Sequence, residues 1–600
     1  MKTGVAFPDF IRTEKPSTRS YEHSFGKDGS KMRGFLLPLL LLVFLLIILI
    51  KLTNLTIFQG SYYRGLSNNN RMRTSIIHAP RGIIFDRNNT PLVFNVPGFR
   101  QIVNGKTQFI DRDAANSLMV KSAKDLEVDN LRQYPYKEEL AHVLGYIGQI
   151  SQDEIKDPKF AGYHQKDMIG KIGVEKQYED ILKGIDGKQL IEVDAVGKKI
   201  RTLGQEDPIS GRDIKLTIDA KLQSASFNAL KDIKKGAIIV STPTGAILSL
   251  VSKPSFDSNL FTLGERYVAA SDSAYRNVTE ILTDSKNQPL LNRVIGGVYP
   301  PGSTFKLVVA SAGLEDKIID EKFEVEDTGV ITVGAFSFAN WFYTDYGKTE
   351  GNVNIVKAIK RSNDIFFYKL ADMLGVEKLS FFARKFGLGE KLGIDLEGER
   401  KGLVPTEEWK KKEIGDNWYL GDNYHYGIGQ GYLLTTPLQV NSWTQAIANK
   451  GVLYRPHLLL DQKSRPKADQ PLAKKFLSEK TISLIRQGMI ESCDTGGVAW
   501  PLFELKVENG KLKVDGKNFF EAPQATTSAN FKDYRKVSVA CKTGTAQHGG
   551  EETVPHAWIT LFAPAYNPEI VITVLAESSG QGSNVAAPIA KKVLEAYFSH

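Results

Sequence analysis

The chain has 600 residues, a formal net charge of +9, and 42% hydrophobic and 24% charged residues. This length exceeds what a single hydrophobic core usually supports, so two or more domains are expected. The composition excludes a disordered or multi-span protein. Because there is no arginine-rich arm, zinc spacing or RNA-binding signature, nucleic acid is not an expected partner. The modest positive charge favours a surface near anionic lipid or an acidic polymer.

Cysteine and histidine are scarce. Cys493 and Cys541 are the only cysteines and stand 48 positions apart, which excludes a disulfide framework and a thiolate metal site. We interpret both as small buried residues, with a disulfide between them as the less favoured alternative. The nine histidines show no paired spacing, so neither a metal nor another cofactor is expected.

An apolar run near the N-terminus is the clearest targeting signal. Residues 34–50 contain no charged or strongly polar side chain, and a semi-apolar stretch continues to Phe58. A membrane-spanning helix needs roughly 20 such residues, whereas a cleaved signal peptide has a shorter core and a small-residue cleavage site. Residues 1–33 hold seven Lys and Arg against four acidic residues, which places them in the cytoplasm. We expect a single anchor at 34–57 in the cytoplasmic membrane, with everything after it periplasmic or extracellular.

Two regions follow the anchor. Residues 58–215 show short, mixed signals: 81–89 predict a strand and a turn, and 173–182 have helical spacing. No nucleophile with a partner base occurs there, so we predict a β-rich pedestal with short helices.

In the second region, 216–600, Asp219 is positioned to cap a helix. Residues 235–250 predict a hairpin around Pro-Thr-Gly, 557–562 and 570–576 predict strands, and 586–598 predict a helix. Strands at both ends with helices between them predict an α/β (α+β) sandwich whose central sheet gathers both ends.

A serine and a lysine with catalytic spacing follow a Pro-Pro-Gly turn. Ser303 and Lys306 are three residues apart at the start of an apolar helical run. On a helix they share a face, so the amine can reach the hydroxyl. A serine needs a base to become a nucleophile, and a lysine with a lowered pKa in a partly buried site can be that base. Taken alone, the pattern also fits a capped helix with a solvated lysine.

Two further motifs strengthen the catalytic interpretation. Lys542-Thr543-Gly544-Thr545 follows the strand-like residues 537–541. We expect it on a strand facing the nucleophile helix, where Gly544 lets a substrate backbone approach and the neighbouring Lys and Thr side chains donate to a carboxylate. Ser362-Asn363-Asp364 lies between the two motifs and precedes an apolar helix, so the Ser362 hydroxyl can relay a proton. A strand end or an N-cap explains each motif singly, but not the ordered set.

This set resembles the motifs of the serine penicillin-recognising enzymes. Longer segments are similar to class B penicillin-binding proteins, and among these to the elongation-type penicillin-binding protein 2 group. The similar segments are residues 79–92, 169–182, 299–306, 427–439, 541–547 and 556–564. The resemblance implies a penicillin-binding, serine β-lactamase-like transpeptidase domain over 216–600, preceded by a dimerisation-type pedestal and one transmembrane helix.

The resemblance also implies residue roles. Ser303 attacks the penultimate D-alanyl carbonyl of a pentapeptide stem and expels D-alanine, with Lys306 as general base and Ser362 passing the proton onward. Backbone N–H groups of Ser303 and Thr545 form the oxyanion hole. A second stem's amine then takes the acyl group, and β-lactams trap the same serine. The substrate-binding residues that the resemblance implies are Asp364, Lys542, Thr543, Gly544 and Thr545.

Asp364 stands where the wider superfamily has Asn. An ionised Asp only accepts hydrogen bonds, so it cannot donate an N–H to the substrate. Elongation-type members resemble this sequence at that position, which favours that branch over a division- or sporulation-type enzyme. Some relatives carry a zinc site of His, Cys and Asp near this motif. Residues 326–361 contain no His and no Cys, so no metal is predicted.

The implied partners are peptidoglycan stem peptides, β-lactams and the cytoplasmic membrane. Because residues 58–215 are too few for an additional glycosyltransferase domain, glycan polymerisation is expected from a partner. We expect a polytopic polymerase of the shape, elongation, division and sporulation class. Two other interpretations stay open. One is a β-lactam hydrolase or sensor on the same scaffold, although the sequence shows no dedicated deacylation base. The other is a non-catalytic activator of a glycan polymerase, against which the intact motif set argues.

Overall fold

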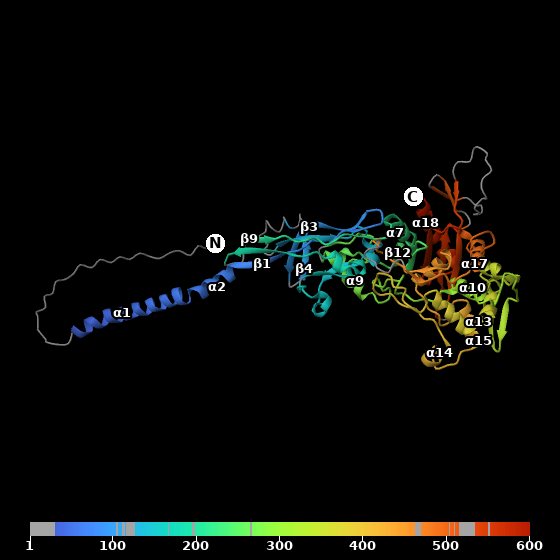
Figure 1. The fold of residues 1–600 in the computed structure, drawn as a ribbon, viewed down its shortest axis with the longest axis horizontal. Coiled ribbons are helices and arrows are strands. Elements are labelled where there is room, and N and C mark those ends of the chain that lie inside the picture. Colours follow the sequence, from blue (N-terminus) through green and yellow to red (C-terminus); the bar gives the residue numbers. More distant parts are fainter. Residues whose placement is uncertain are drawn as a thin grey trace, which may run out of the picture. The chain divides into compact units, whose positions relative to one another are not determined.

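The computed structural model describes residues 31–599, apart from 104–105, 111–114, 116–125, 166, 195–198, 265–266, 462–469, 503–504, 509–510, 515–533 and 550–552. The chain folds into two compact units, drawn as a ribbon in Figure 1. The first unit consists of the N-terminal part up to Ser75 together with Lys188–Glu206. The second consists of Ile76–Gly187 together with Asp207–His600.

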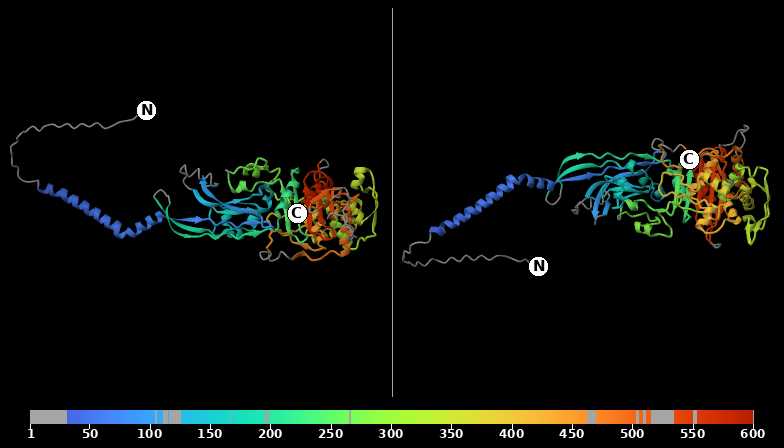
Figure 2. Two further views of the ribbon diagram at one scale, coloured as in Figure 1. Left: turned by 90° about the horizontal axis from the view of Figure 1, so that it is seen from above. Right: turned by 60° about the horizontal axis from the view of Figure 1, so that its bottom comes forward.

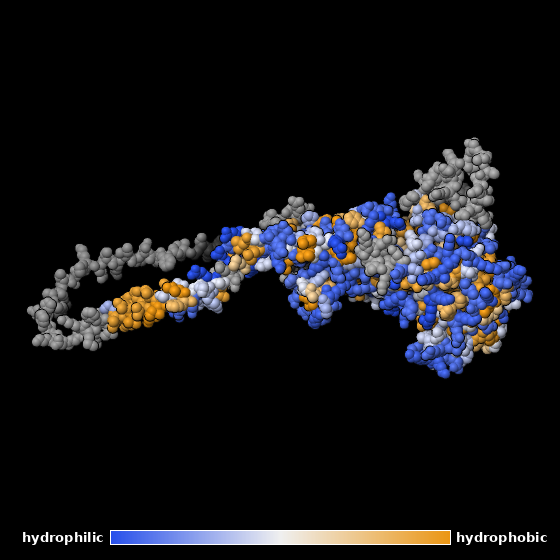
Figure 3. Space-filling view, in the orientation of Figure 1, coloured by the Kyte–Doolittle hydropathy of each residue, from blue (hydrophilic) through white to orange (hydrophobic). Residues whose placement is uncertain are grey.

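The first unit contains the apolar helix. α1 (Lys31–Thr53) continues through a π-helical segment, η1 (Asn54–Phe58), and α2 (Gly60–Arg71) follows. Leu37–Phe58 is long and apolar enough to cross a membrane, and its surface is the orange band of Figure 3. This is the kind of helix that the anchor prediction at 34–57 requires, whereas residues 1–30 lie outside the described residues. A three-stranded sheet completes the unit: β1 (Met72–Ile77), β8 (Gly187–Val193) and β9 (Lys199–Glu206).

The pedestal part of the second unit is β-rich with short helices, as predicted. Its main sheet has the order β10-β2-β3-β4, and β5 pairs with β3. The helical pattern at 173–182 forms two short helices, because Tyr178 leaves the helical conformation between them. The elements are β2 (Ile84–Phe85), β3 (Pro91–Val103), β4 (Lys106–Ile110), β5 (Leu126–Gln133), α4 (Ala141–Leu144), β6 (Tyr146–Gln149), β7 (Met168–Ile172), α5 (Gly173–Gln177), α6 (Glu179–Leu182) and β10 (Ile214–Lys215).

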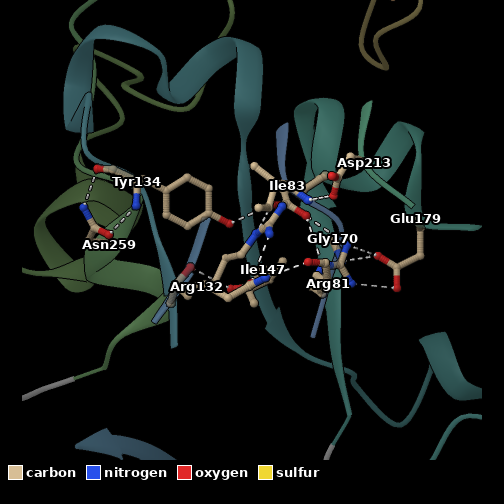
Figure 4. A network of polar contacts seen from close by, with 12 residues as sticks. Arg81, Ile83, Arg132, Tyr134, Ile147, Gly170, Glu179, Asp213 and Asn259 are labelled. Atoms are coloured by element: carbon tan, nitrogen blue, oxygen red, sulfur yellow. Dashed lines mark hydrogen bonds and ion pairs between the residues drawn. The ribbon is translucent and has the colours of Figure 1, made fainter. Parts of the chain in front are cut away.

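A buried ion network holds the pedestal together (Figure 4). The Arg81 guanidinium lies 2.9 Å from the Glu175 carboxylate and 2.8 Å from that of Glu179, and Arg132 lies 2.8 Å from Glu175. All four side chains are buried, so each charge depends on its partners because water cannot solvate it. Arg81 and the two glutamates come from the two pedestal segments that carry the family resemblance, so these segments have a structural role: they pair buried charges with one another.

The part of the second unit that follows the pedestal is built around a five-stranded antiparallel sheet of order β12-β11-β24-β23-β22. β11 and β12 form the predicted hairpin, and β11 pairs with β24 near the C-terminus, so the sheet gathers both ends of the region as expected. The green and red strands lie side by side in both views of Figure 2. The strands are β11 (Gly236–Ser241), β12 (Ile247–Lys253), β22 (Ala540–Ala546), β23 (His556–Ala563) and β24 (Ile570–Ala576).

Helices cover both faces of this sheet. Alternate residues of each strand point to opposite faces: Ile238 packs with α7 (Ala220–Ala229) and α18 (Ala587–Phe598), whereas Ile239 packs in the larger core with α10 (Lys306–Glu315) and α16 (Pro437–Ala448). Burial on both faces explains the continuous apolar runs of the central strands. Asp219 caps α7 as predicted, accepting hydrogen bonds from the amides of Lys221 and Leu222.

The remaining described elements surround this sandwich. The helices are α8 (Asn259–Thr262), α9 (Val278–Thr283), α11 (Trp341–Tyr346), α12 (Ile355–Arg361), α13 (Asp364–Lys385), α14 (Glu407–Glu413), α15 (Leu420–Gly427) and α17 (Glu479–Ser492). The strands are β13 (Glu324–Asp327), β14 (Val330–Val333), β15 (Phe336–Ala339), β16 (Gly351–Asn354), β17 (Leu453–Tyr454), β18 (Pro471–Ala473), β19 (Leu505–Glu508), β20 (Lys511–Val514) and β21 (Tyr534–Lys536).

The two cysteines are buried, as predicted, but they form a disulfide, which was the less favoured alternative. Cys493 ends α17 and Cys541 lies in β22, with Cα atoms 5.9 Å apart. The sequence did not indicate this pairing, because the two cysteines are 48 residues apart and are brought together by the packing of α17 against β22.

Candidate active site

The nucleophile motif forms a tight turn at the start of α10. Gly302–Thr304 is one turn of 3-10 helix, and Lys306 is the first residue of α10. Gly302 has a φ of +55°, and a Cβ at this position would lie 2.9 Å from the carbonyl oxygen of Thr545. Only glycine fits both the backbone conformation and this close approach to β22. The turn therefore presents Ser303 beside the edge strand of the sheet.

Ser303 is partly exposed, in contrast to its buried neighbours. Among the described residues, no side chain or backbone group forms a hydrogen bond with its hydroxyl. The turn around it is nevertheless fixed: the Thr304 hydroxyl donates to the carbonyl of Pro301 at 2.8 Å, and the Trp558 indole donates to that of Pro300 at 3.1 Å. A fixed, accessible and uncommitted hydroxyl is what a nucleophile requires.

Lys306 is fully buried behind the turn. Its Nζ donates to the Asp364 Oδ1 at 2.6 Å and to the backbone carbonyl of Ser362 at 2.8 Å, and it lies 3.4 Å from the Ser362 hydroxyl. The amine is therefore held by the middle motif. The predicted helix face thus brings Lys306 to the site, and the contacts to Ser362 and Asp364 fix its position.

The middle motif joins two helices. Ser362 ends α12 in the left-handed conformation, with a φ of +53°, which is uncommon for a residue other than glycine. Asn363 caps α13 by accepting from the Phe366 amide at 2.9 Å. Asp364 begins α13, and its second oxygen accepts from the Trp341 amide at 2.9 Å. Its carboxylate is thus occupied by two protein donors, whereas the family resemblance implied a contact with substrate.

The Lys542 amine also contacts the Ser362 hydroxyl. β22 is the edge strand, paired to β23 alone, and carries Lys542, Thr543, Gly544 and Thr545. The fully buried Lys542 Nζ donates to the Ser362 hydroxyl at 2.8 Å and to the Thr543 carbonyl at 3.0 Å. The Ser362 oxygen therefore lies between two lysine amines. Thr543 is buried, whereas Thr545 is exposed.

Packing requires a glycine at position 544, in addition to the predicted approach of substrate. A Cβ there would lie 3.0 Å from the carbonyl oxygen of Pro301 and 3.1 Å from the Thr304 methyl. A side chain would push β22 away from the nucleophile turn. Gly429 packs against the same turn, since a Cβ on it would lie 2.2 Å from the Gly302 oxygen. The turn is thus clamped between two glycine-lined backbones.

Burial shapes the electrostatics of the two lysines. Burial lowers the pKa of Lys306 below its ordinary value, while the charge and hydrogen bond of Asp364 oppose this shift. Burial, and next the charge of Lys306, lowers the pKa of Lys542 well below its ordinary value, with Asp364 again opposing. The charge of Lys306 thus disfavours a charged Lys542, whereas the contact with Asp364 favours a charged Lys306.

The predicted site residues are thus brought together from four elements. Sequence reasoning missed several residues that contact them directly, among them Trp341, whose amide binds Asp364, and Gln430, whose amide group donates to the Thr545 carbonyl at 3.4 Å. Gln430 lies in the segment 427–439, whose dense glycines were a signal for close packing at the site. Trp341 gave no such signal, because its contact uses a backbone N–H.

One His and Asp group among the described residues has the geometry to hold a metal ion. His78, Asp167 and Asp186 lie in the pedestal with ligand atoms within 4.8 Å of one another. Two cations already face this group: Arg100 lies 2.8 Å from the His78 ring, and Lys183 lies 3.5 Å from Asp167. The local charge is therefore already balanced, and the group supports no metal centre.

Comparison with known families gives the site its context. Residues 236–595 match the penicillin-binding protein transpeptidase domain, and residues 123–216 match the penicillin-binding protein dimerisation domain. The chain belongs to the penicillin-binding protein family. The α+β transpeptidase fold, the pedestal before it and the one apolar helix are therefore confirmed, whereas the exact domain limits stay predictions.

Similar proteins align with this chain along nearly its whole length. The peptidoglycan D,D-transpeptidase MrdA of Haemophilus influenzae is 30% identical over 91% of this chain and 88% of its own length. The structure of Pseudomonas aeruginosa PBP2 in complex with WCK 5153 is 35% identical with a TM-score of 0.65, covering 88% of this chain and 96% of that one. A structure described as coordinating polymerization and crosslinking in a peptidoglycan synthase complex is 27% identical with a TM-score of 0.67, covering 95% and 99%.

Proposed function

We propose that Ser303, Lys306, Ser362 and the Lys542 motif carry the cross-linking reaction of cell-wall elongation. The chain is a serine-type peptidoglycan D,D-transpeptidase that binds β-lactams, as its family and its MrdA relative indicate. The observation that carries the assignment of residues is the meeting of Lys306 with Asp364 and Ser362, and of Lys542 with Ser362. The partly exposed Ser303 lies three residues before Lys306, on a turn that packs against the same strand as Lys542.

The reaction follows from this arrangement. The Ser303 oxygen attacks the penultimate D-alanyl carbonyl to give a tetrahedral adduct, and its proton passes to the neutral Lys306 amine. The proton then travels through the Ser362 hydroxyl to the nitrogen of the terminal D-alanine, whose C–N bond breaks, so that D-alanine leaves and an ester remains on Ser303. An amine of a second stem attacks this ester and forms the cross-linking amide, while its proton returns through the site to the Ser303 oxygen as the ester C–O bond breaks.

The substrate carboxylate is held at the edge of β22. Thr545 is exposed there, and its hydroxyl accepts from the Gly582 amide at 3.3 Å, so its own proton is free for a ligand. Lys542 is buried behind the strand and acts on the carboxylate through its charge and through Ser362. The amides of Ser303 and Thr545 form the oxyanion hole, which the packing of Gly302 on Thr545 supports.

The cellular setting completes the proposal. The first unit anchors the chain in the cytoplasmic membrane through Leu37–Phe58, with the N-terminus inside and the catalytic part outside. Glycan strands come from a polytopic polymerase of the shape, elongation, division and sporulation class. The similar structure whose description couples polymerization to crosslinking supports such a partner. Asp364 and the MrdA relative favour elongation over division or sporulation.

The test uses the full-length chain with a fluorescent penicillin. Mass spectrometry should locate the penicilloyl adduct on Ser303, and Ser303→Ala should abolish it. Ser311→Ala is the matched control, since Ser311 lies on the same helix but only donates to the Leu307 carbonyl. An adduct on another residue would refute the assignment of the nucleophile. An adduct that is hydrolysed within seconds would instead support the β-lactam hydrolase.

A further inference from the structure

The carboxylate of Asp327 lies at the end of β13 and is buried, with 3% of its surface exposed. It forms no ion pair with any described residue, yet four N–H groups donate to it. Oδ1 accepts from the Gly329 amide at 2.9 Å. Oδ2 accepts from the Asn340 side chain at 2.8 Å, the Asn363 side chain at 2.9 Å and the Glu350 amide at 2.9 Å. A buried charge without a cation is retained only where its hydrogen bonds replace water.

Two of these donors tie Asp327 to the catalytic motif. Asn363 stands between Ser362 and Asp364, and while its Nδ2 binds Asp327, its Oδ1 caps α13. Asn340, which is fully buried, accepts from the Asp364 amide at 3.2 Å and donates to Asp327. Asp327 thus contacts the residue between Ser362 and Asp364 directly and reaches the backbone of Asp364 through Asn340.

The strained backbone of Ser362 explains why such an anchor is needed. A left-handed conformation in a non-glycine residue is unfavourable and persists only where surrounding contacts over-determine it. Here the Asn363 amide donates to the Ala358 carbonyl at 3.0 Å in the C-terminal cap of α12, and the side-chain contacts of Asn363 hold this cap in place. If Asn363 were free to rotate, Ser362 could relax, and its hydroxyl would leave the point between Lys306 and Lys542.

We propose that Asp327 is a positioning residue of the transpeptidase, which fixes Ser362 and Asp364 through Asn363 and Asn340. This inference rests on the proposed function, since it gives Asp327 a role in acylation only if Ser362 and Lys306 carry the proton. Asp327 contacts neither the substrate nor the reacting atoms. Its effect should therefore appear in the rate of acylation and not in the affinity for the β-lactam.

The decisive variant is Asp327→Asn in the full-length chain, measured by stopped-flow acylation with a fluorescent penicillin. The side-chain NH₂ group of the new asparagine replaces an oxygen that accepted hydrogen bonds, so it faces N–H groups of its neighbours. The loss of these buried hydrogen bonds should slow acylation by about five- to a hundredfold. The dissociation constant of the non-covalent complex should stay within twofold. Asp345→Asn, on the neighbouring helix α11, is the charge-matched control and should acylate at the wild-type rate.

Coupling separates positioning through Asn363 from general destabilisation. In Asp327→Asn/Asn363→Ser, the two substitutions act on the same hydrogen bond, the one that Asn363 donates to Asp327. The double variant should acylate about as fast as the slower single variant, whereas two independent losses of stability would combine. If Asp327→Asn does not fold, Asn363→Ser keeps a capping hydroxyl and removes only the donor to Asp327, and it should also slow acylation.

Two outcomes overturn the inference. One is wild-type acylation in both Asp327→Asn and Asn363→Ser. The other is a double variant whose slowing equals the product of the two single effects. Ser303→Ala, run in parallel, keeps the two proposals distinct: residual labelling in that variant refutes the proposed nucleophile, whatever the Asp327 series shows.

Discussion

Replacing Asp364 by asparagine tests how the site controls its base. The carboxylate accepts from Lys306 at 2.6 Å with one oxygen and from the Trp341 amide at 2.9 Å with the other. An asparagine has one acceptor oxygen, so its NH₂ group must face one of these donors. Losing a buried, charge-assisted hydrogen bond costs about 1.5–3 kcal/mol. If this cost falls on the transition state, acylation should slow by about ten- to a hundredfold.

The same substitution should also shift the pH dependence of acylation. Asp364 raises the pKa of Lys306 against the effect of burial. Removing its charge therefore lowers the pKa of Lys306 further, so the neutral, proton-accepting amine persists to lower pH. The acidic limb of the acylation profile should move to lower pH, although the plateau rate falls. An effect on stability alone would change neither limb.

The assay is single-turnover acylation by a fluorescent penicillin across the pH range in which the chain stays folded. Asp372→Asn is the matched control, because Asp372 lies on the same helix and is exposed. Its profile should superimpose on that of the wild type. A wild-type plateau in Asp364→Asn, or an acidic limb that moves to higher pH, would refute the role assigned to the carboxylate.

Three further predictions follow from the described contacts. Replacing both cysteines (Cys493→Ala with Cys541→Ala) opens a loop of 48 residues and should lower the free energy of unfolding by about 4 kcal/mol in a urea titration. An unchanged unfolding midpoint would argue against the disulfide. Arg81→Met leaves two buried carboxylates without their shared cation and should destabilise the chain by about 3–5 kcal/mol in the same titration, without altering acylation of the folded fraction. Ser362→Ala removes the oxygen between the two amines and should slow acylation about a hundredfold with an unchanged unfolding midpoint, whereas a wild-type rate would exclude the relay.

The sequence predicted which elements carry the motif residues, because most of that geometry is local. The spacing of Ser303 and Lys306 places both at the start of one helix, and the apolar run before Lys542 places that motif on a strand. The long apolar segments also predicted the central sheet, since strands buried on both faces carry few polar residues.

What the sequence did not predict depends on contacts between distant segments. Asp364 binds Lys306 across 58 positions and Trp341 across 23. Asp327 reaches Asn363 across 36 positions, and no local pattern marks it as different from a surface acid. Gly544 was assigned to substrate approach alone, because the nucleophile turn that packs against it comes from a separate part of the chain.

The two lysines differ in a way that gives the site an order of protonation. Lys306 has Asp364 at 2.6 Å, whereas Lys542 has only neutral acceptors, the Ser362 hydroxyl and the Thr543 carbonyl. Burial lowers the pKa of both, and the charge of Lys306 adds to the effect on Lys542. Lys306 therefore holds a proton more readily than Lys542 does. A substrate carboxylate at the edge of β22 favours the charged form of Lys542, and the Ser362 hydroxyl, in contact with both amines, lets the proton cross. Binding of the correct substrate would thus free Lys306 to activate Ser303, which explains why both lysines meet at one serine.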